Sequence, residues 1–203
     1  MQAVFIDYIT LILITVATGL VVLACYVYWD LDGPNQRRWA PPFLVVGGLA
    51  TAAGLHMAFT WPLPGSYNAI YGETTVLIGL LFLGAALAVA KGWDLLPLTI
   101  FALFAGVDAI LAGVGIIYIE TAGSRWVAVL GFIVTGVAGV LALPAWLLRT
   151  KRAVRLAGAL TLLLAALIWF TTTYMAFWMH MEMMKTWQPT TALVRQGGQG
   201  GGQ

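Results

Sequence analysis

The segment with the clearest metal-binding chemistry lies near the C-terminus of this 203-residue chain, where residues 175–184 contain five methionines and one histidine. On a helix, side chains three and four positions apart share a face, so His180, Met183 and Met184 would lie together. Thioether sulfur and imidazole nitrogen suit monovalent copper better than zinc, calcium or magnesium. The alternative is packing against lipid or a partner, because methionine also fills irregular gaps. The candidate metal ligands are His56, Met179, His180, Glu182, Met183 and Met184.

A second histidine, His56, lies in an apolar stretch and is followed by Met57. If its helix is a neighbour of the helix that carries His180, the two imidazoles could ligate a metal ion or a haem iron. The alternative for each histidine is a hydrogen bond to a loop carbonyl, which needs no cofactor. The sequence leaves a copper or haem redox site and a structural role both open.

One carboxylate, Asp108, falls near the middle of a long apolar segment. A charged carboxylate in the centre of a bilayer costs about 2.5 kcal/mol or more unless it is protonated or paired. Asp108 is therefore predicted to face protein or water. It could be the proton or ion site of a small transporter, or a neutral side chain hydrogen-bonded between helices.

Sequence patterns of common enzymes are absent from the chain. There is no Gly-x-Ser-x-Gly, no His-Glu-x-x-His and no phosphate-binding glycine loop. Ser66 and His56 could form a nucleophile and its base, but Ser66 follows Pro64 and Gly65 and is more simply a turn residue. We therefore expect no independent enzymatic activity. A net charge of +2 also gives no reason to expect nucleic acid as a partner.

The elements that would position these residues are transmembrane helices. The chain is 61% hydrophobic and 9% charged, and its apolar residues form long blocks. About 20 apolar residues span a bilayer as a helix, because every backbone polar group must be satisfied within its own segment. An all-α bundle of about six spans is predicted in the cell membrane, forming one domain over residues 1–187 with a flexible Gly/Gln-rich tail at 188–203. The predicted spans are 4–29, 42–60, 74–90, 95–119, 126–148 and 156–179.

Orientation follows from the distribution of Lys and Arg. Six spans place three basic residues on the side of both termini and seven on the other side. Cytoplasmic loops carry the excess of Lys and Arg, so both termini are predicted to lie outside. The loop at 61–73 and both histidines then lie near the outer face.

The loop between the second and third spans carries a distinctive motif. Its sequence is His56 followed by Trp61-Pro62-Leu63-Pro64-Gly65-Ser66-Tyr67-Asn68 and then Tyr71-Gly72-Glu73. This stretch resembles the signature of a family of small prokaryotic multi-spanning membrane proteins classed as a domain of unknown function. The resemblance implies a fold and an outer-loop motif but no reaction. The motif positions that it implies are His56, Trp61, Pro62, Gly65, Ser66, Tyr67, Asn68, Gly72 and Glu73.

Low charge and the lack of catalytic motifs favour a non-catalytic accessory subunit of a larger membrane complex. Its partners would be the lipid bilayer and other membrane subunits. A copper-dependent monooxygenase or a respiratory complex would fit the Met/His segment. Two alternatives stay open: a proton- or ion-coupled transporter that uses Asp108, and a haem or copper redox protein.

Overall fold

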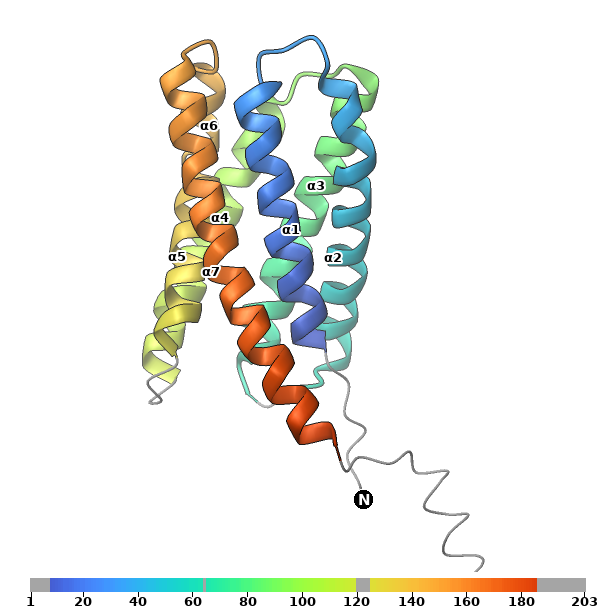
Figure 1. The fold of residues 1–203 in the computed structure, drawn as a ribbon, viewed down its shortest axis with the longest axis vertical. Helices are drawn as coiled ribbons and strands as arrows, with labels where there is room; N and C mark the ends of the chain where they lie inside the picture. The colour runs from blue at the N-terminus through green and yellow to red at the C-terminus, as the bar shows by residue number, and fades with distance from the viewer. Residues whose placement is uncertain (1–7, 64, 120–124, 186–203) are drawn as a thin grey trace, which may run out of the picture.

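Seven α-helices and no β-strand make up the part of the chain that the computed structural model describes, residues 8–63, 65–119 and 125–185 (Figure 1). Five of these helices are long and apolar enough to cross a membrane. The prediction of an all-α, multi-pass membrane protein is confirmed. The helices are α1 (Tyr8–Trp29), α2 (Ala40–Thr60), α3 (Thr74–Lys91), α4 (Leu96–Ile119), α5 (Arg125–Val140), α6 (Ala142–Leu147) and α7 (Arg152–Met184).

Besides the five long helices, α5 and α6 together form one further crossing, and a break at Leu141 separates them. The sequence predicted one continuous span over 126–148. Pro144 explains the difference, because a proline ring clashes with the carbonyl of the residue four positions earlier, which is Val140. The helix ends at Val140 and restarts one residue later.

Two short helical turns flank the second crossing. Gln36–Trp39 forms a 3₁₀ turn before α2, and Asn68–Glu73 forms a π-helix that leads directly into α3. The sequence predicted a loop over 61–73, so the second half of that loop is helical instead. The last helix is also longer than the predicted span at 156–179, because it begins at Arg152 and continues to Met184.

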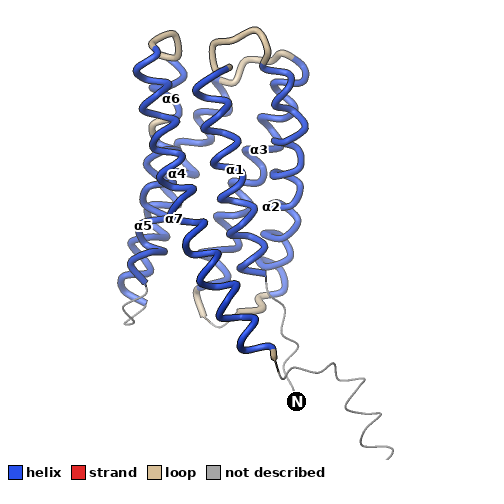
Figure 2. The backbone as a smooth tube through the Cα atoms, in the orientation of Figure 1, coloured by secondary structure: helices blue, strands red, loops and turns tan. Residues whose placement is uncertain are grey.

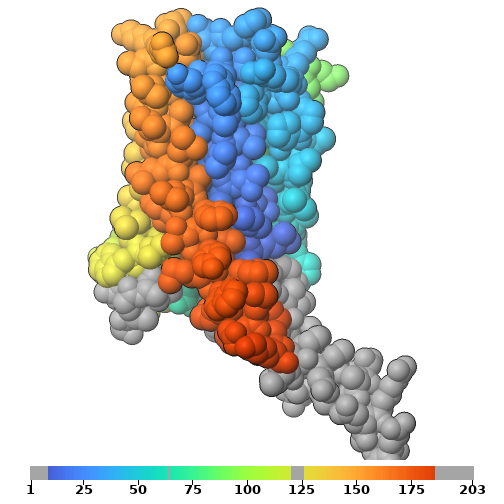
Figure 3. All heavy atoms as spheres, viewed as in Figure 1, coloured from blue at the N-terminus to red at the C-terminus, as the bar shows by residue number. Residues whose placement is uncertain are grey.

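The helices pack as three close pairs, α2 with α3, α4 with α5, and α1 with α7. Glycines permit the first two pairings. A Cβ atom on Gly47 would lie 2.6 Å from the Leu83 nitrogen, and one on Gly106 would lie 2.6 Å from the Gly136 carbonyl oxygen. Small residues let helix backbones approach closely in lipid. The third pair joins the first and last helices, and α7 lies across α1 in Figure 3.

The two ends of the bundle differ in their loops (Figure 2). We call one the basic end, because it carries seven of the ten Lys and Arg residues of the chain: Arg37, Arg38, Lys91, Arg149, Lys151, Arg152 and Arg155. The other, the motif end, carries residues 61–67. The hydroxyl of Thr10 lies 3.2 Å from Nδ1 of His180, so the start of α1 and the end of α7 meet at the motif end. This arrangement matches an even number of crossings. Residues 188–203, the predicted flexible tail, lie outside the described residues.

Candidate functional site

The motif between α2 and α3 is organised around one buried side chain, Asn68. Its carboxamide is fully buried. Its Oδ1 accepts a hydrogen bond from the Leu63 N–H at 2.8 Å, and its Nδ2 donates to the carbonyls of Leu63 at 2.5 Å and Gly65 at 3.2 Å. One amide thereby satisfies three backbone groups of an irregular turn, which buried backbone requires. The motif residue Asn68 is a clamp for the loop.

The other motif residues shape the same turn. Trp61 ends α2 in a left-handed conformation with φ of +50°, and Gly65 has φ of +59°, a region that glycine enters without strain. Trp61, Pro62, Gly65, Ser66 and Glu73 are exposed, Tyr67 is half-buried and Gly72 is buried against α2. Ser66 and His56 are both exposed, and Pro64 lies outside the described residues. Most of the motif therefore builds the turn, and its chemically reactive groups face outward.

The π-helix that follows the clamp places Tyr71 inside the bundle. Tyr67 stacks on Tyr71 with 6.4 Å between ring centroids. Tyr71 meets Phe132 of α5 edge to face at 5.3 Å, and Phe132 meets Trp169 of α7 at 5.0 Å. Edge-to-face contacts at these separations are favourable. The four rings form a continuous aromatic row from the motif end to the middle of α7.

A small cavity lies beside this row. It encloses about 20 Å³ and is lined by Tyr71, Phe132 and Trp169, together with apolar residues of α1 and three threonines. This volume holds about one water molecule. We call it the inner pocket.

A much larger cavity, which we call the chamber, adjoins the inner pocket and extends to the basic end. Its volume is about 410 Å³, and residues from all seven helices line it, which places it along the bundle axis. The lining is almost wholly apolar. Four residues line both cavities, and we call them the junction: Thr74, Ile78, Ala109 and Thr135.

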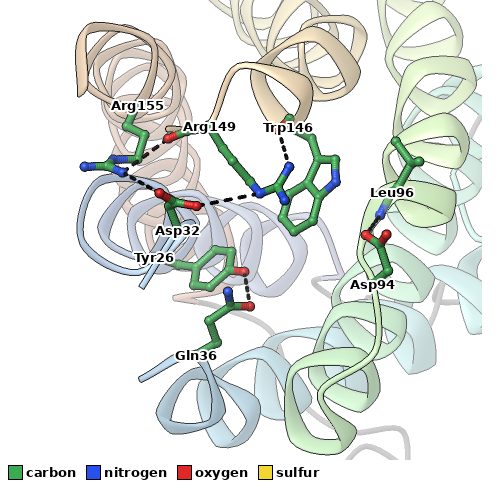
Figure 4. Close-up of polar contacts among 8 residues, drawn as sticks. All are labelled: Tyr26, Asp32, Gln36, Asp94, Leu96, Trp146, Arg149 and Arg155. Carbon is green, nitrogen blue, oxygen red and sulfur yellow. Dashed lines mark hydrogen bonds and ion pairs between the residues drawn. The ribbon is translucent and has the colours of Figure 1, made fainter. Parts of the chain in front are cut away.

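Ion pairs surround the chamber at the basic end (Figure 4). Asp32, in the turn after α1, pairs with Arg149 at 3.9 Å and with Arg155 at 3.8 Å. The Arg149 guanidinium lies 4.3 Å from the ring centroid of Trp146, which lines the chamber. These contacts connect the α1 turn to the α6–α7 turn. Each partly exposed pair contributes at most about 1 kcal/mol, so the connection is weak.

Two further hydrogen bonds lie at that end. The Tyr26 hydroxyl donates to Oε1 of Gln36 at 3.1 Å, and the Leu96 N–H donates to Oδ1 of Asp94 at 2.8 Å (Figure 4). The second bond caps the start of α4, as carboxylates do at helix N-termini. Both tie short turns to the helices that form the chamber wall.

The predicted metal ligands are spread over the motif end. His180 bonds to Thr10 of α1, whereas Nδ1 of His56 lies 3.2 Å from the Thr60 hydroxyl on its own helix. Glu182 pairs with Lys185, one turn further along α7. The side chains of Met179 and Met183 are exposed and that of Met184 is half-buried. Among the described residues, no three His, Cys, Asp or Glu side chains gather as a metal site would require. The copper site stays a prediction.

Asp108 is half-buried on α4. Within the described chain it makes no ion pair and no hydrogen bond. It lines neither the chamber nor the inner pocket, although its neighbour Ala109 lines both. The carboxylate therefore points away from the cavities.

The residues that line these cavities could not be recognised from the sequence. Thr74, Thr135 and Phe132 lie within apolar spans and carry no recognisable pattern. Trp169 is the one available signal, because tryptophan in membrane helices concentrates at the interfaces and Trp169 is near the middle of α7. A buried tryptophan at that depth indicates a contact inside the bundle.

Comparison with known proteins places the fold. No curated protein matches the chain. The cryoEM structure of the Helicobacter pylori urea channel in a closed state is similar with a TM-score of 0.60 and 20% sequence identity, over 80% of this chain and 97% of that chain. The crystal structure of the urea channel from the same gastric pathogen is similar with a TM-score of 0.56 and 21% identity over the same shares. At this identity the likeness concerns the fold. Residues 1–183 match the family described as "Protein of unknown function (DUF981)", and the chain belongs to that family, in agreement with the resemblance carried by its loop motif.

Proposed function

We propose that this protein is a membrane conduit, a channel or carrier, for a small uncharged solute. The observation that carries the proposal is the axial chamber of about 410 Å³, which adjoins the inner pocket across the junction. A passage through a helix bundle needs such a series of spaces along its axis. The fold that the chain shares with a solved urea channel supports the proposal.

The chamber lining favours neutral solutes over ions. Its wall is almost wholly apolar, and its few polar side chains are hydroxyls. An ion that entered would lose its hydration and gain no charged partner, which costs several kcal/mol or more. Asp108, the carboxylate considered above for ion coupling, does not line the chamber. The structure therefore favours an uncoupled path for a neutral molecule.

The inner pocket makes this conformation a closed one. About 20 Å³ admits a single water molecule, so Tyr71, Phe132 and Trp169 must separate before a larger solute passes. Phe132 contacts both Tyr71 and Trp169 edge to face, and Trp169 also donates a hydrogen bond to Thr135. A modest shift of α7 relative to α5 would open the pocket.

Solute flux into proteoliposomes tests the proposal. Purified protein in liposomes should accelerate entry of urea, acetamide or glycerol after an osmotic step, without conductance for potassium or chloride. Ala109→Trp would fill the junction and should reduce flux to the level of protein-free vesicles. Leu111→Trp makes a comparable change on the exposed face of the same helix and should leave flux intact.

The proposal fails if wild-type vesicles take up no solute of the panel faster than empty vesicles. It also fails if Ala109→Trp, eluting as a monodisperse particle, conducts as well as Leu111→Trp. The accessory-subunit interpretation, with or without copper, rests on the sequence alone, and no contact among the described residues adds to it.

A further inference from the structure

The hydroxyl groups that face the chamber are unequal in their hydrogen bonding. A hydroxyl has one proton to donate and two lone pairs that accept. Five hydroxyl-bearing residues line the chamber, and four of them donate their proton to protein: Tyr26 to Gln36, Thr74 to the Ile70 carbonyl, Thr99 to the Leu96 carbonyl and Thr161 to the Ala157 carbonyl. The fifth is Thr135.

Thr135 is the acceptor, not the donor, in its hydrogen bond. Its oxygen accepts a bond of 2.8 Å from Nε1 of Trp169. Its own proton has no acceptor among the described residues. Thr135 is half-buried and lines both cavities, so a solute that supplies an acceptor there gains one hydrogen bond, worth about 0.5–1.5 kcal/mol.

The α3 side of the junction offers the complementary groups. Thr74 and Thr75 donate to the carbonyls of Ile70 and Tyr71, both at 2.5 Å, so toward the cavities their oxygens can only accept. Thr74 lines both cavities and Thr75 lines the inner pocket. The junction thus presents the Thr74 acceptor on α3 and the Thr135 donor on α5, and Thr75 adds a second acceptor inside the inner pocket. Because Thr74 and Thr135 also line the chamber, a solute at its inner end reaches them before the inner pocket opens.

We propose that Thr135 determines the specificity of the conduit, by donating to a carbonyl oxygen of a small neutral amide whose N–H groups bond to the oxygens of Thr74 and Thr75. A planar amide carries its acceptor at one end and its donors at the other, as this pair of surfaces requires. Solutes with a weak acceptor leave the Thr135 proton without a good partner in an almost wholly apolar chamber, and the loss of such a hydrogen bond lets a site discriminate between similar molecules. The inference rests on the proposed function, because it concerns the solute of that same path.

Urea and thiourea form the test pair, since they have the same shape and N–H groups but thiourea replaces the carbonyl oxygen with a weakly accepting sulfur. Flux into proteoliposomes should favour urea over thiourea in the wild type. Thr135→Val keeps the shape of the side chain and removes the hydroxyl, so the urea-to-thiourea ratio should fall about three- to tenfold, which is the worth of one hydrogen bond. Thr135→Ser retains the hydroxyl and should retain the ratio.

Two further variants separate recognition from support of the fold. Trp169→Phe removes the bond to Thr135 and shortens a side chain of the inner pocket, so the flux of both solutes changes. The Thr135 proton stays available, so the urea-to-thiourea ratio should stay within about twofold of wild type. Thr171→Val makes the same chemical change as Thr135→Val at an exposed site on α7, whose hydroxyl bonds to Leu167, and should change nothing.

The outcomes distinguish this inference from the conduit itself. Flux of both solutes with no urea preference in the wild type, or a preference that survives Thr135→Val, would overturn the role of Thr135 and leave the conduit standing. A loss of preference in Trp169→Phe equal to that in Thr135→Val would show that Thr135 acts only by holding the ring. Absence of all flux in the wild type would refute the conduit.

Discussion

At the scale of single residues, one buried amide accounts for much of the loop motif. Asn68 replaces the backbone partners that Leu63 and Gly65 lose where the chain leaves α2. An exposed turn could use water for this purpose, but this turn lies beside the buried π-helix. The motif therefore shapes the turn by which the chain re-enters the bundle. It positions Tyr71 at the inner pocket.

Replacing Asn68 with Ala should destabilise the protein clearly. The change leaves one N–H and two carbonyls of the turn without their partner, which costs about 1–3 kcal/mol. In a domain of this size that corresponds to a fall in the melting temperature of about 2–10 °C. Thermal unfolding in detergent, followed by tryptophan fluorescence, measures the shift.

Asn35 is the matched control. It is exposed and makes no side-chain capping bond, so Asn35→Ala should leave the melting temperature unchanged. Equal melting temperatures for the two variants would contradict the clamp.

At the scale of helices, one of the close crossings joins α4 to α5 through glycines. A Cβ on Gly106 would lie 2.6 Å from both the Gly136 carbonyl oxygen and the Val140 nitrogen. Backbone atoms cannot rotate away as a side chain does, so any added methyl group must push the two helices apart. The chamber depends on this contact, because Gly106 of α4 and Gly139 of α5 both line it.

Gly106→Ala should therefore cost about 1–3 kcal/mol, the usual cost of overpacking. Gly115→Ala, on the same helix, has no atom within 4 Å of the added Cβ. It should be neutral or slightly stabilising, since alanine favours a helix more than glycine does. The comparison uses the denaturation midpoints of the two variants in one detergent. Equal stability of Gly106→Ala and Gly115→Ala would contradict the close α4–α5 contact.

The helices could be predicted from the sequence because their length and apolar character are local properties. The all-α bundle of about six spans was predicted in this way. The break at Leu141 was missed, although Pro144 contained the information. The π-helix at 68–73 was missed because nothing local distinguishes it from a loop. The junction threonines were missed for a different reason: their meaning depends on which helices are neighbours, and pairings such as α1 with α7 are not encoded in any short window.

At the scale of the whole molecule, the charge distribution predicts orientation in the membrane. Seven of ten basic residues gather at the basic end, which the positive-inside rule assigns to the cytoplasm. In a Cys25→Ala background, Ser66→Cys at the motif end should react with a membrane-impermeant maleimide on intact cells. Asn35→Cys at the basic end should react only after the membrane is permeabilised. The reverse pattern of labelling would invert the assigned topology.

The pairing of α1 with α7 has a consequence for biosynthesis. The ribosome releases helices into the membrane in order, so α1 arrives first and its partner arrives last. Synthesis of the intervening residues takes on the order of ten seconds at the usual rate of translation. During that interval the part of α1 that α7 covers in the finished protein is exposed to lipid or to a helper protein. A chain that terminates before α7 never forms this contact, so part of α1 stays exposed to lipid.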